Sequence, residues 1–395
     1  MKTRFIFSFL LLVVLSNTIL LAQRPIEHQH LQNSYNANAL ALSHVLTALP
    51  SNEPMSIFYN PAQIGSFTNQ TQFVGSSSLF SFSPEDYTTR LNGAFVFGWK
   101  PSEESPLGLG ISYYSNRYSY EKDSFESNPK PDGSASLTKD PHGRSHAFAI
   151  GASYQTIKGI KIQAGFTYKT SVDDQLQLNY TRLNNELYSY AIAESNKQDL
   201  TDFGYQVHFP ISNWVPKTWL QLKNANEQSF SIILGYAKRN MGFTNNPDSW
   251  IYLPLQSTST LALAFNYSIF SAEKTLLTAS FSMESEKEGT ELFGSSEVYS
   301  DLILLKRLST AIRVELLETI SVSSGYNTKA PNLYSESIGF ELAFKGMMQL
   351  INPKLSKSNI FYRLEPRFSF ASAIPINADL NQIYVNSIQF RYIFM

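Results

Sequence analysis

Apolar and polar residues alternate with a period of two along most of this chain. In residues 160–169, isoleucine, alanine, phenylalanine and tyrosine at the even positions alternate with lysine, glutamine, glycine and threonine at the odd positions. A period of two places each set on one face of a β-strand. The pattern predicts an all-β fold of about 14 antiparallel strands. These strands are expected near residues 70–82, 89–100, 106–120, 144–157, 159–170, 201–211, 226–239, 258–270, 273–284, 298–306, 312–326, 335–346, 358–372 and 384–395.

The polar face of these segments carries few charges. It holds mainly glycine, alanine, serine and threonine, and many segments end in an aromatic residue such as Trp99, Tyr154 or Tyr168. Such a face suits the lumen of a barrel whose other face meets lipid, and terminal aromatic residues suit the membrane interfaces. Aromatic residues make up 14% of the chain and charged residues only 16%, whereas soluble domains carry about 25% charged residues. We therefore predict a transmembrane β-barrel rather than a soluble β-sandwich or propeller.

The expected connections alternate between short and long. Short ones lie at 156–159 and 271–274, and long polar ones at about 120–143, 171–202 and 284–296. Short periplasmic turns and long outer loops are typical of bacterial barrels. The last segment places Ile388, Phe390, Tyr392 and Phe394 on one face, which predicts that it closes the barrel against the first strand.

The amino terminus predicts export. Lys2 and Arg4 precede an apolar stretch over residues 5–15, and Ala22 is a suitable last residue before cleavage. We interpret residues 1–22 as a signal peptide. The net charge of −1 argues against a nucleic-acid partner. The predicted location is the outer membrane of a Gram-negative bacterium, with outer-membrane lipids as partners.

Residues 23–66 are expected to form a plug-like segment ahead of a barrel over residues 67–395. A helix ended by Pro50 is predicted, and Met55 to Tyr59 should be extended. Asn60-Pro61 then makes a fixed corner, because proline sets its own φ and restricts the preceding residue. The predicted helical stripe is Leu42, Val45, Leu46 and Leu49.

The corner carries a family resemblance. Ala39-Leu40-Ala41-Leu42 followed by Ser56-Ile57-Phe58-Tyr59-Asn60-Pro61-Ala62 resembles the N-terminal signature of the PorV/PorQ group of Bacteroidetes outer-membrane barrels, within the superfamily of the fatty-acid channel FadL. Leu253-Pro254-Leu255 and the hairpin around 314–326 resemble later features of that group. The resemblance implies a role in type IX secretion, in which the barrel binds or anchors exported cargo proteins. The plug and corner residues that it marks are Leu42, Leu46, Phe58, Tyr59, Asn60, Pro61 and Ala62.

Two other functions stay open. The chain could be a FadL-like passive channel that takes a hydrophobic ligand between plug and lumen, or a structural barrel. The sequence holds no phosphate-binding glycine loop, zinc pattern or nucleophile elbow, which predicts a non-enzyme without cofactor or metal. Asp140, Ser145 and His146 are close in sequence, but neighbours on a strand point to opposite faces, so we do not interpret them as a catalytic set.

Overall fold

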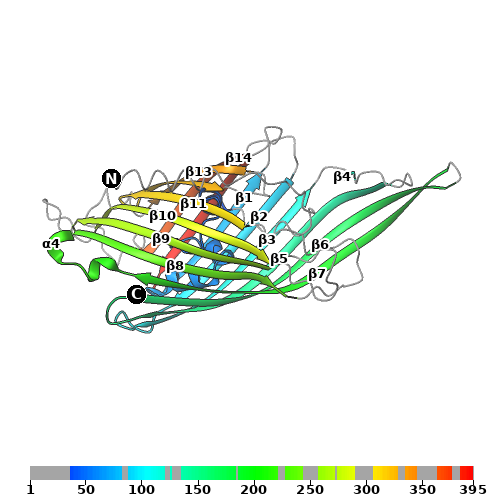
Figure 1. The fold of residues 1–395 in the computed structure, drawn as a ribbon. Helices are drawn as coiled ribbons and strands as arrows, with labels where there is room; N and C mark the ends of the chain where they lie inside the picture. Colours follow the sequence, from blue (N-terminus) through cyan, green and yellow to red (C-terminus); the bar gives the residue numbers. More distant parts are fainter. Residues whose placement is uncertain are drawn as a thin grey trace.

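The computed structural model shows a β-barrel with its own N-terminal segment in the lumen (Figure 1). None of the helices in the described part of the chain has the length and apolar character needed to cross a bilayer. The predicted signal peptide, residues 1–22, lies outside the described residues. The structure describes residues 36–81, 88–120, 125–126, 135–183, 186–220, 227–242, 257–271, 274–289, 306–327, 334–344, 363–375 and 383–394.

Fifteen strands form one sheet, which closes because β3 pairs with β5. The two-residue β4 pairs only with β5, so the other 14 strands make the ring. This confirms the predicted fold class. The strands are β1 (Gln72–Ser81), β2 (Thr88–Trp99), β3 (Leu107–Tyr120), β4 (Phe125–Glu126), β5 (Ala135–Gln155), β6 (Lys161–Leu183), β7 (Glu186–Phe209), β8 (Glu227–Met241), β9 (Ser257–Ser271), β10 (Lys274–Gly289), β11 (Lys306–Leu316), β12 (Ile320–Asn327), β13 (Tyr334–Ala343), β14 (Leu364–Pro375) and β15 (Ile383–Ile393).

The first and last strands pair directly. β1 runs antiparallel to β15 from Gln72 opposite Ile393 to Ser81 opposite Tyr384. Since every neighbouring pair in the ring is antiparallel, no described strand of the ring is left with an open edge around the wall. Closure satisfies the backbone hydrogen-bonding groups that a bilayer cannot.

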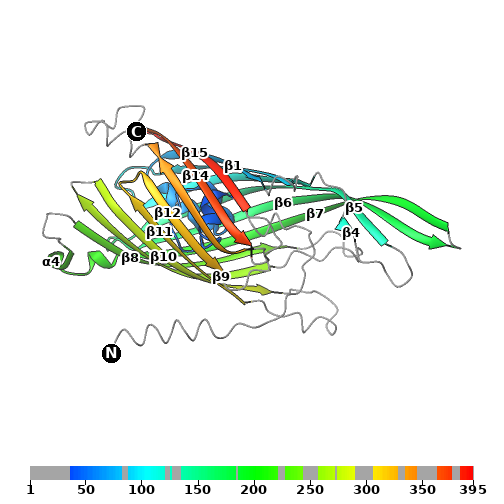
Figure 2. The same cartoon turned by 90° about the horizontal axis from the view of Figure 1, so that it is seen from above.

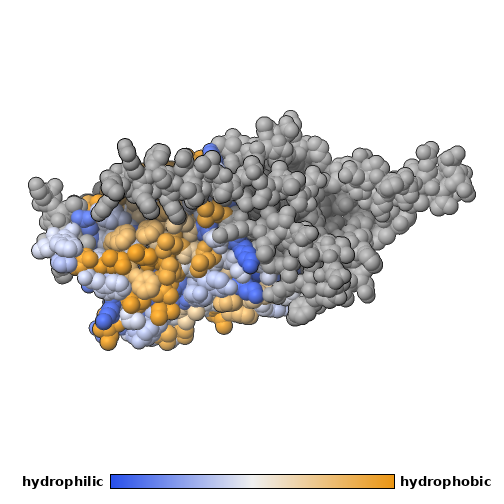
Figure 3. All heavy atoms as spheres, viewed as in Figure 1, coloured by the Kyte–Doolittle hydropathy of each residue, from blue (hydrophilic) through white to orange (hydrophobic). Residues whose placement is uncertain are grey.

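The outer face of the wall is apolar. Along β12, exposed and buried side chains alternate without interruption, and the exposed ones include Val322 and Tyr326. The same alternation exposes Phe148 on β5 and Phe340 on β13. Figure 3 shows such residues as a broad orange area over the strands of one face. This face is the lipid-facing surface of a transmembrane barrel.

Strands β6 and β7 are much longer than predicted. The segment 171–202, expected as a long polar loop, is instead a hairpin in which Ser171 pairs with Gln198 and Leu183 with Glu186. Figure 2 shows this hairpin projecting well beyond the rest of the barrel. A spanning strand needs only about 9–11 residues, and β6 and β7 have 23 and 24. Strands beyond the lipid need no apolar face, so their polar composition resembled that of a loop.

One hairpin near the C-terminus also differs from the prediction. Residues 312–326, predicted as a single strand by their alternation but as part of a hairpin by the family resemblance, form the ends of β11 and β12 joined by a turn at 317–319. Leu317 and Glu318 have φ angles of 54° and 51°, the left-handed values of a tight hairpin turn. Neither is glycine or asparagine, so the sequence carries no turn signal there. Most of the segment 298–306, predicted as a separate strand, lies outside the described residues.

The segment before β1 contains short helices rather than the predicted elements. These are α3 (Ala37–Ala41), η1 (Pro54–Phe58) and η2 (Pro61–Thr68). The predicted helix over 42–49 is wrong, because Ser43 and His44 adopt φ angles of 47° and 64° that end the helix at Ala41. The predicted extended stretch Met55 to Tyr59 is also wrong, since η1 is a 3-10 helix. Most of the segment is buried, with Asn52, Asn69 and Gln70 as its exposed residues, so its apolar spacing did not indicate a helical face.

Candidate functional site

The candidate site is the barrel interior, where residues 36–71 cross the lumen. We call these residues the N-terminal segment. Its helix α3 packs against β12 to β15, whereas η2 packs against β2, β3, β5, β6 and β7. Figures 1 and 2 show it in blue, enclosed by the wall. The segment therefore contacts widely separated parts of the ring.

The Asn60-Pro61 corner fixes the middle of the segment. Asn60 is extended, with φ −150° and ψ 112°, and its side chain caps η2 by accepting a hydrogen bond from the Ala62 amide at 3.0 Å. Its side-chain nitrogen, Nδ2, donates to the backbone carbonyl of Thr47 at 2.7 Å and to that of Tyr205 on β7 at 3.5 Å. Pro61 supplies the first helical position, where no amide hydrogen is needed. The corner thus joins two turns of the segment to the wall.

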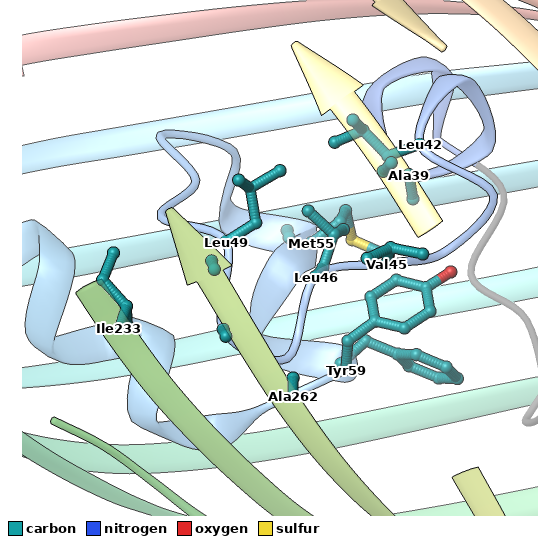
Figure 4. Packing of buried hydrophobic residues seen from close by; sticks show 14 of the residues in the cluster. Ala39, Leu42, Val45, Leu46, Leu49, Met55, Tyr59, Ile233 and Ala262 are labelled. Carbon is teal, nitrogen blue, oxygen red and sulfur yellow. The ribbon is translucent and has the colours of Figure 1, made fainter. Parts of the chain in front are cut away.

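An apolar cluster surrounds this corner (Figure 4). Its members from the segment pack against small apolar side chains of the wall, such as Ala147, Ala262 and Ala311. Phe58 meets Tyr59 and the wall residue Tyr114 edge-to-face, with ring centroids 5.4 and 5.5 Å apart. The lumen is thus apolar at this level. The segment residues of the cluster are Ala39, Leu42, Val45, Leu46, Ala48, Leu49, Met55, Phe58 and Tyr59.

Glycines in the wall make room for the segment. A Cβ atom at Gly165 would lie 2.2 Å from the carbonyl oxygen of Pro61, and one at Gly204 would lie 1.9 Å from the side-chain oxygen of Asn60. These distances are far below van der Waals contact, so any side chain would displace the segment. The other wall glycines that abut it are Gly98, Gly108, Gly110, Gly151, Gly235, Gly325 and Gly339.

Polar side chains of the wall hold the backbone of the segment. The Ala37 amide donates to Ser387 Oγ at 2.8 Å, and Gln206 donates to the Thr47 carbonyl at 2.7 Å. Ser43 and Ser337 join their hydroxyls at 2.8 Å. The Thr47 amide donates to the carboxylate of Glu284. Such bonds satisfy backbone groups that the irregular segment leaves without regular partners.

A chain of buried charges lies beside α3. Glu341 on β13 accepts from Arg313 at 3.2 Å and from Arg367 at 2.7 Å, and Arg391 pairs with Glu365 at 3.3 Å. Asn38 of the segment donates to Glu341 at 3.2 Å. Removing one member would leave a buried charge unpaired, which is strongly destabilising. The ionic chain therefore fixes the wall on which α3 rests.

A second ionic group lies over the aromatic residues. Lys169 pairs with Asp202 at 2.7 Å, and Arg239 pairs with Glu286 at 2.6 Å. The Lys169 nitrogen lies 5.6 Å from the ring centroid of Phe58, and the guanidinium of Arg239 lies 5.7 Å from that of Tyr59. These are cation–π distances. Phe58 and Tyr59 therefore face positively charged side chains on the side of the lumen formed by β6 to β10.

Glu53 is a buried acid within the N-terminal segment itself. It caps η1 by accepting a hydrogen bond from the Met55 amide. Burial raises the pKa of its carboxyl to about 7, and the negative charge of Glu341 acts in the same direction. The group belongs to the segment and not to a spanning strand.

The structure separates the two predicted residue sets. Leu42, Leu46, Phe58, Tyr59, Asn60, Pro61 and Ala62 all lie together in the lumen and are all buried. Ile388, Phe390, Tyr392 and Phe394 lie on β15 and the residue after it, and Phe390 and Phe394 are exposed on the outer face. The first set belongs to the candidate site, and the second belongs to the wall.

Sequence reasoning missed the ionic residues and the glycines. Each occupies an inward position of the alternation, as Glu341 does between Phe340 and Leu342. That inward position was the sequence feature that could have identified these residues as lining the lumen. His208 also occupies an inward position, and its Nε2 lies 3.0 Å from the side-chain oxygen of Gln163. Ser145 is fully buried, whereas Phe148 and His146 belong to the outward set, so Ser145 and His146 do face opposite sides.

The fold and its interior define a transmembrane β-barrel with its lumen occupied by its own N-terminal segment. No family model and no curated protein matches the sequence. Solved structures with a similar arrangement include the toluene transporter TbuX of Ralstonia pickettii, at 10% identity and a TM-score of 0.49, covering 91% of this chain and 98% of that one. A FadL homologue of Pseudomonas aeruginosa has 9% identity and a TM-score of 0.46, with coverage of 91% and 98%. The β domain of the Bordetella autotransporter BrkA has 7% identity and a TM-score of 0.39, with coverage of 82% and 99%. Similarity at this level assigns neither a substrate nor a partner to the chain.

Proposed function

We propose that this protein is a passive outer-membrane channel for hydrophobic small molecules, with the N-terminal segment as its gate. The observation that carries the proposal is the apolar cluster in the middle of the lumen. A channel for hydrophilic solutes needs a continuous water-filled path. Here Leu46, Met55, Phe58 and Tyr59 instead present apolar and aromatic groups to the wall. A solute that passes this level must be compatible with that surface.

The two halves of the N-terminal segment are held to the wall in different ways, which suggests that only one of them moves to open the channel. The glycines and the Asn60 corner hold its η2 half closely against β5 to β7. The part around Ser43 and His44 is held by hydrogen bonds to Ser337 and is bent through two left-handed residues. Non-glycine residues in that conformation each cost about 1 kcal/mol or more. We therefore place the moving part at residues 42–46, ahead of Thr47, whose backbone amide and carbonyl are held by Glu284 and Gln206.

The secretion function implied by the PorV/PorQ resemblance is the weaker candidate. It requires a cargo-binding surface on the outer loops, and the loops 243–256 and 290–305 lie outside the described residues. Nothing in the described interior favours a protein cargo over a small apolar ligand. Native mass spectrometry of the protein extracted from its membrane tests this: a bound protein would favour secretion, and a small lipid-like adduct would favour the channel.

A reversible disulfide tests the channel directly. The chain has no cysteine, so a Ser43→Cys, Ser337→Cys pair forms the only possible bridge, at positions whose hydroxyl oxygens are 2.8 Å apart. The matched control is Ser268→Cys with Thr278→Cys, whose oxygens are 3.1 Å apart on the adjacent strands β9 and β10. Both pairs bring their side-chain ends together, but only the first ties the segment to the wall.

The readout is uptake of radiolabelled toluene and of a long-chain fatty acid by proteoliposomes, with glucose as the hydrophilic comparison. We expect the wild type to take up an apolar probe and to exclude glucose. Oxidising the Ser43–Ser337 pair should reduce uptake to that of protein-free vesicles, reductant should restore it, and the control bridge should leave it unchanged. Wild-type uptake no greater than that of empty vesicles would overturn the channel, and undiminished uptake through the oxidised pair would overturn the gate.

A further inference from the structure

We propose that the connection between β7 and β8 is an interfacial foot that binds the phospholipid headgroup layer beside the barrel. We define the foot as residues 210–219 together with Ile157 of the neighbouring turn. The connection contains η3 (Ile211–Asn213) and α4 (Lys217–Leu220). Figure 1 shows α4 at the end of the molecule opposite the long β6–β7 hairpin.

The position of Trp214 places the foot on the lipid side of the wall. Phe203 and Tyr205 are exposed on the outer face of β7, and Phe209 continues that alternation to the end of the strand. Trp214 meets Phe209 edge-to-face with ring centroids 6.3 Å apart. The chain therefore turns back outside the barrel after β7 instead of passing under the lumen.

The neighbouring turn supports the foot. A Cβ atom at Gly159 would lie 2.6 Å from the side-chain nitrogen of Asn213 and 3.2 Å from Pro210. Gly159 also has a φ of +82°, so this tight approach needs glycine for two reasons. The contact brings Ile157, which is fully exposed, next to the same surface.

The exposed side chains of the foot match an interface. Trp219 is 76% exposed and Trp214 49% exposed. Exposed tryptophans are costly in water but favoured at headgroup depth, where the ring is buried and the indole N–H remains hydrated. Lys158 is exposed beside Ile157 and can pair with lipid phosphate. The patch also continues the outward apolar surface of Tyr154 and Ile162, so the occupant that fits is the bilayer already in contact with the wall.

Single-tryptophan variants test the foot in vesicles of phosphatidylcholine. The four tryptophans are at positions 99, 214, 219 and 250, so Trp99→Phe, Trp214→Phe, Trp250→Phe leaves only Trp219. Lipids brominated at acyl carbons 6 and 7 should quench about half or more of its emission, whereas aqueous acrylamide should quench it weakly. The matched control replaces all four tryptophans by phenylalanine and adds Glu103→Trp, an exposed position at the same rim in the β2–β3 connection, which should show the opposite pattern.

Acrylamide quenching of Trp219 equal to that of the control, without quenching by brominated lipid, would overturn the foot. Only protein that migrates as a folded barrel on unheated gels is scored. If a triple variant does not fold, wild-type protein labelled with fluorotryptophan gives the same answer by ¹⁹F NMR. Spin-labelled lipid should then broaden the Trp214 and Trp219 resonances, and unbroadened resonances would equally reject the proposal.

Discussion

Gly204 and Asn60 illustrate how single residues fit the N-terminal segment to the wall. A methyl group at position 204 would lie 1.9 Å from the Asn60 side-chain oxygen, so Gly204→Ala must push the corner away from β7. We expect a loss of about 1–3 kcal/mol in the free energy of unfolding, as for other overpacked sites. Urea titration in detergent, followed by the gel mobility of unheated samples, measures it.

Two further variants separate this clash from a general effect of alanine. Gly93→Ala is the control, because a Cβ atom there meets nothing closer than 3.8 Å, and it should be nearly neutral. Asn60→Ala is itself destabilising, since the cap and the bond to Thr47 are lost, but it removes the atom that clashes. The double variant should therefore lose less stability than the sum of the single variants. Additive losses would contradict the proposed contact.

Glu53 gives the segment a dependence on pH. Its folded pKa of about 7 exceeds its ordinary value of 4.5, so the folded state holds the proton more tightly than the unfolded chain. Stability from this group is present below pH 4.5 and is lost as pH rises to about 7, a change of about 3 kcal/mol. Glu53→Gln should be more stable than the wild type at pH 8 and similar to it at pH 4. The urea midpoints of the wild type and of Glu53→Gln at both pH values test this. If the two proteins differed in midpoint by the same amount at pH 4 and pH 8, the prediction would be wrong.

At the scale of elements, the sequence predicts the spanning strands well because lipid and lumen impose opposite demands on alternate residues. The stretch 160–169 is an example: its outward Phe166 and Tyr168 and its inward Gln163 and Lys169 lie where the period of two places them. Where one of the two demands is absent, the prediction fails. The described residues 171–183 and 186–202 leave the membrane, so no apolar face marks them, although their backbones pair with one another throughout.

The N-terminal segment shows the opposite failure. Its contents were predictable, since Leu42, Leu46, Phe58 and the Asn60 corner do meet in one buried cluster. Its backbone conformation was not predictable, because a segment that is buried along most of its length has no regular alternation of apolar and polar faces. The left-handed turn at Ser43 and His44 depends on Ser337 and on other groups about 300 positions away. Such contacts have no local signature.

At the scale of the whole molecule, the barrel is shaped around its contents. Nine glycines, several alanines and two ionic groups line the surfaces that meet the segment. Without the N-terminal segment, the apolar wall residues of the cluster would be exposed to water in the lumen, which is unfavourable. In the described residues the segment and the wall therefore pack as one unit.

The long hairpin defines the orientation of this unit in the membrane. β6 and β7 each exceed the length needed to span a bilayer by more than ten residues, and they extend from the end opposite the short turns at 156–160 and 317–319. In a bacterial barrel the long connections face outward. Trypsin added to intact cells should therefore cut the hairpin after the exposed Lys197 while the foot stays protected. The cut barrel should keep its fast mobility on unheated gels and separate into two fragments on boiling.

A Lys197→Gln, Arg182→Gln variant is the control and should resist this cleavage in intact cells. Because β6 remains paired with β5 over its spanning part and β7 with β8, a cut outside the membrane leaves the ring closed. If trypsin cut after Lys197 only in permeabilised cells, the hairpin would face the periplasm and the proposed orientation would be wrong. It would also place the foot and its tryptophans at the outer leaflet, where lipopolysaccharide rather than phospholipid forms the surface.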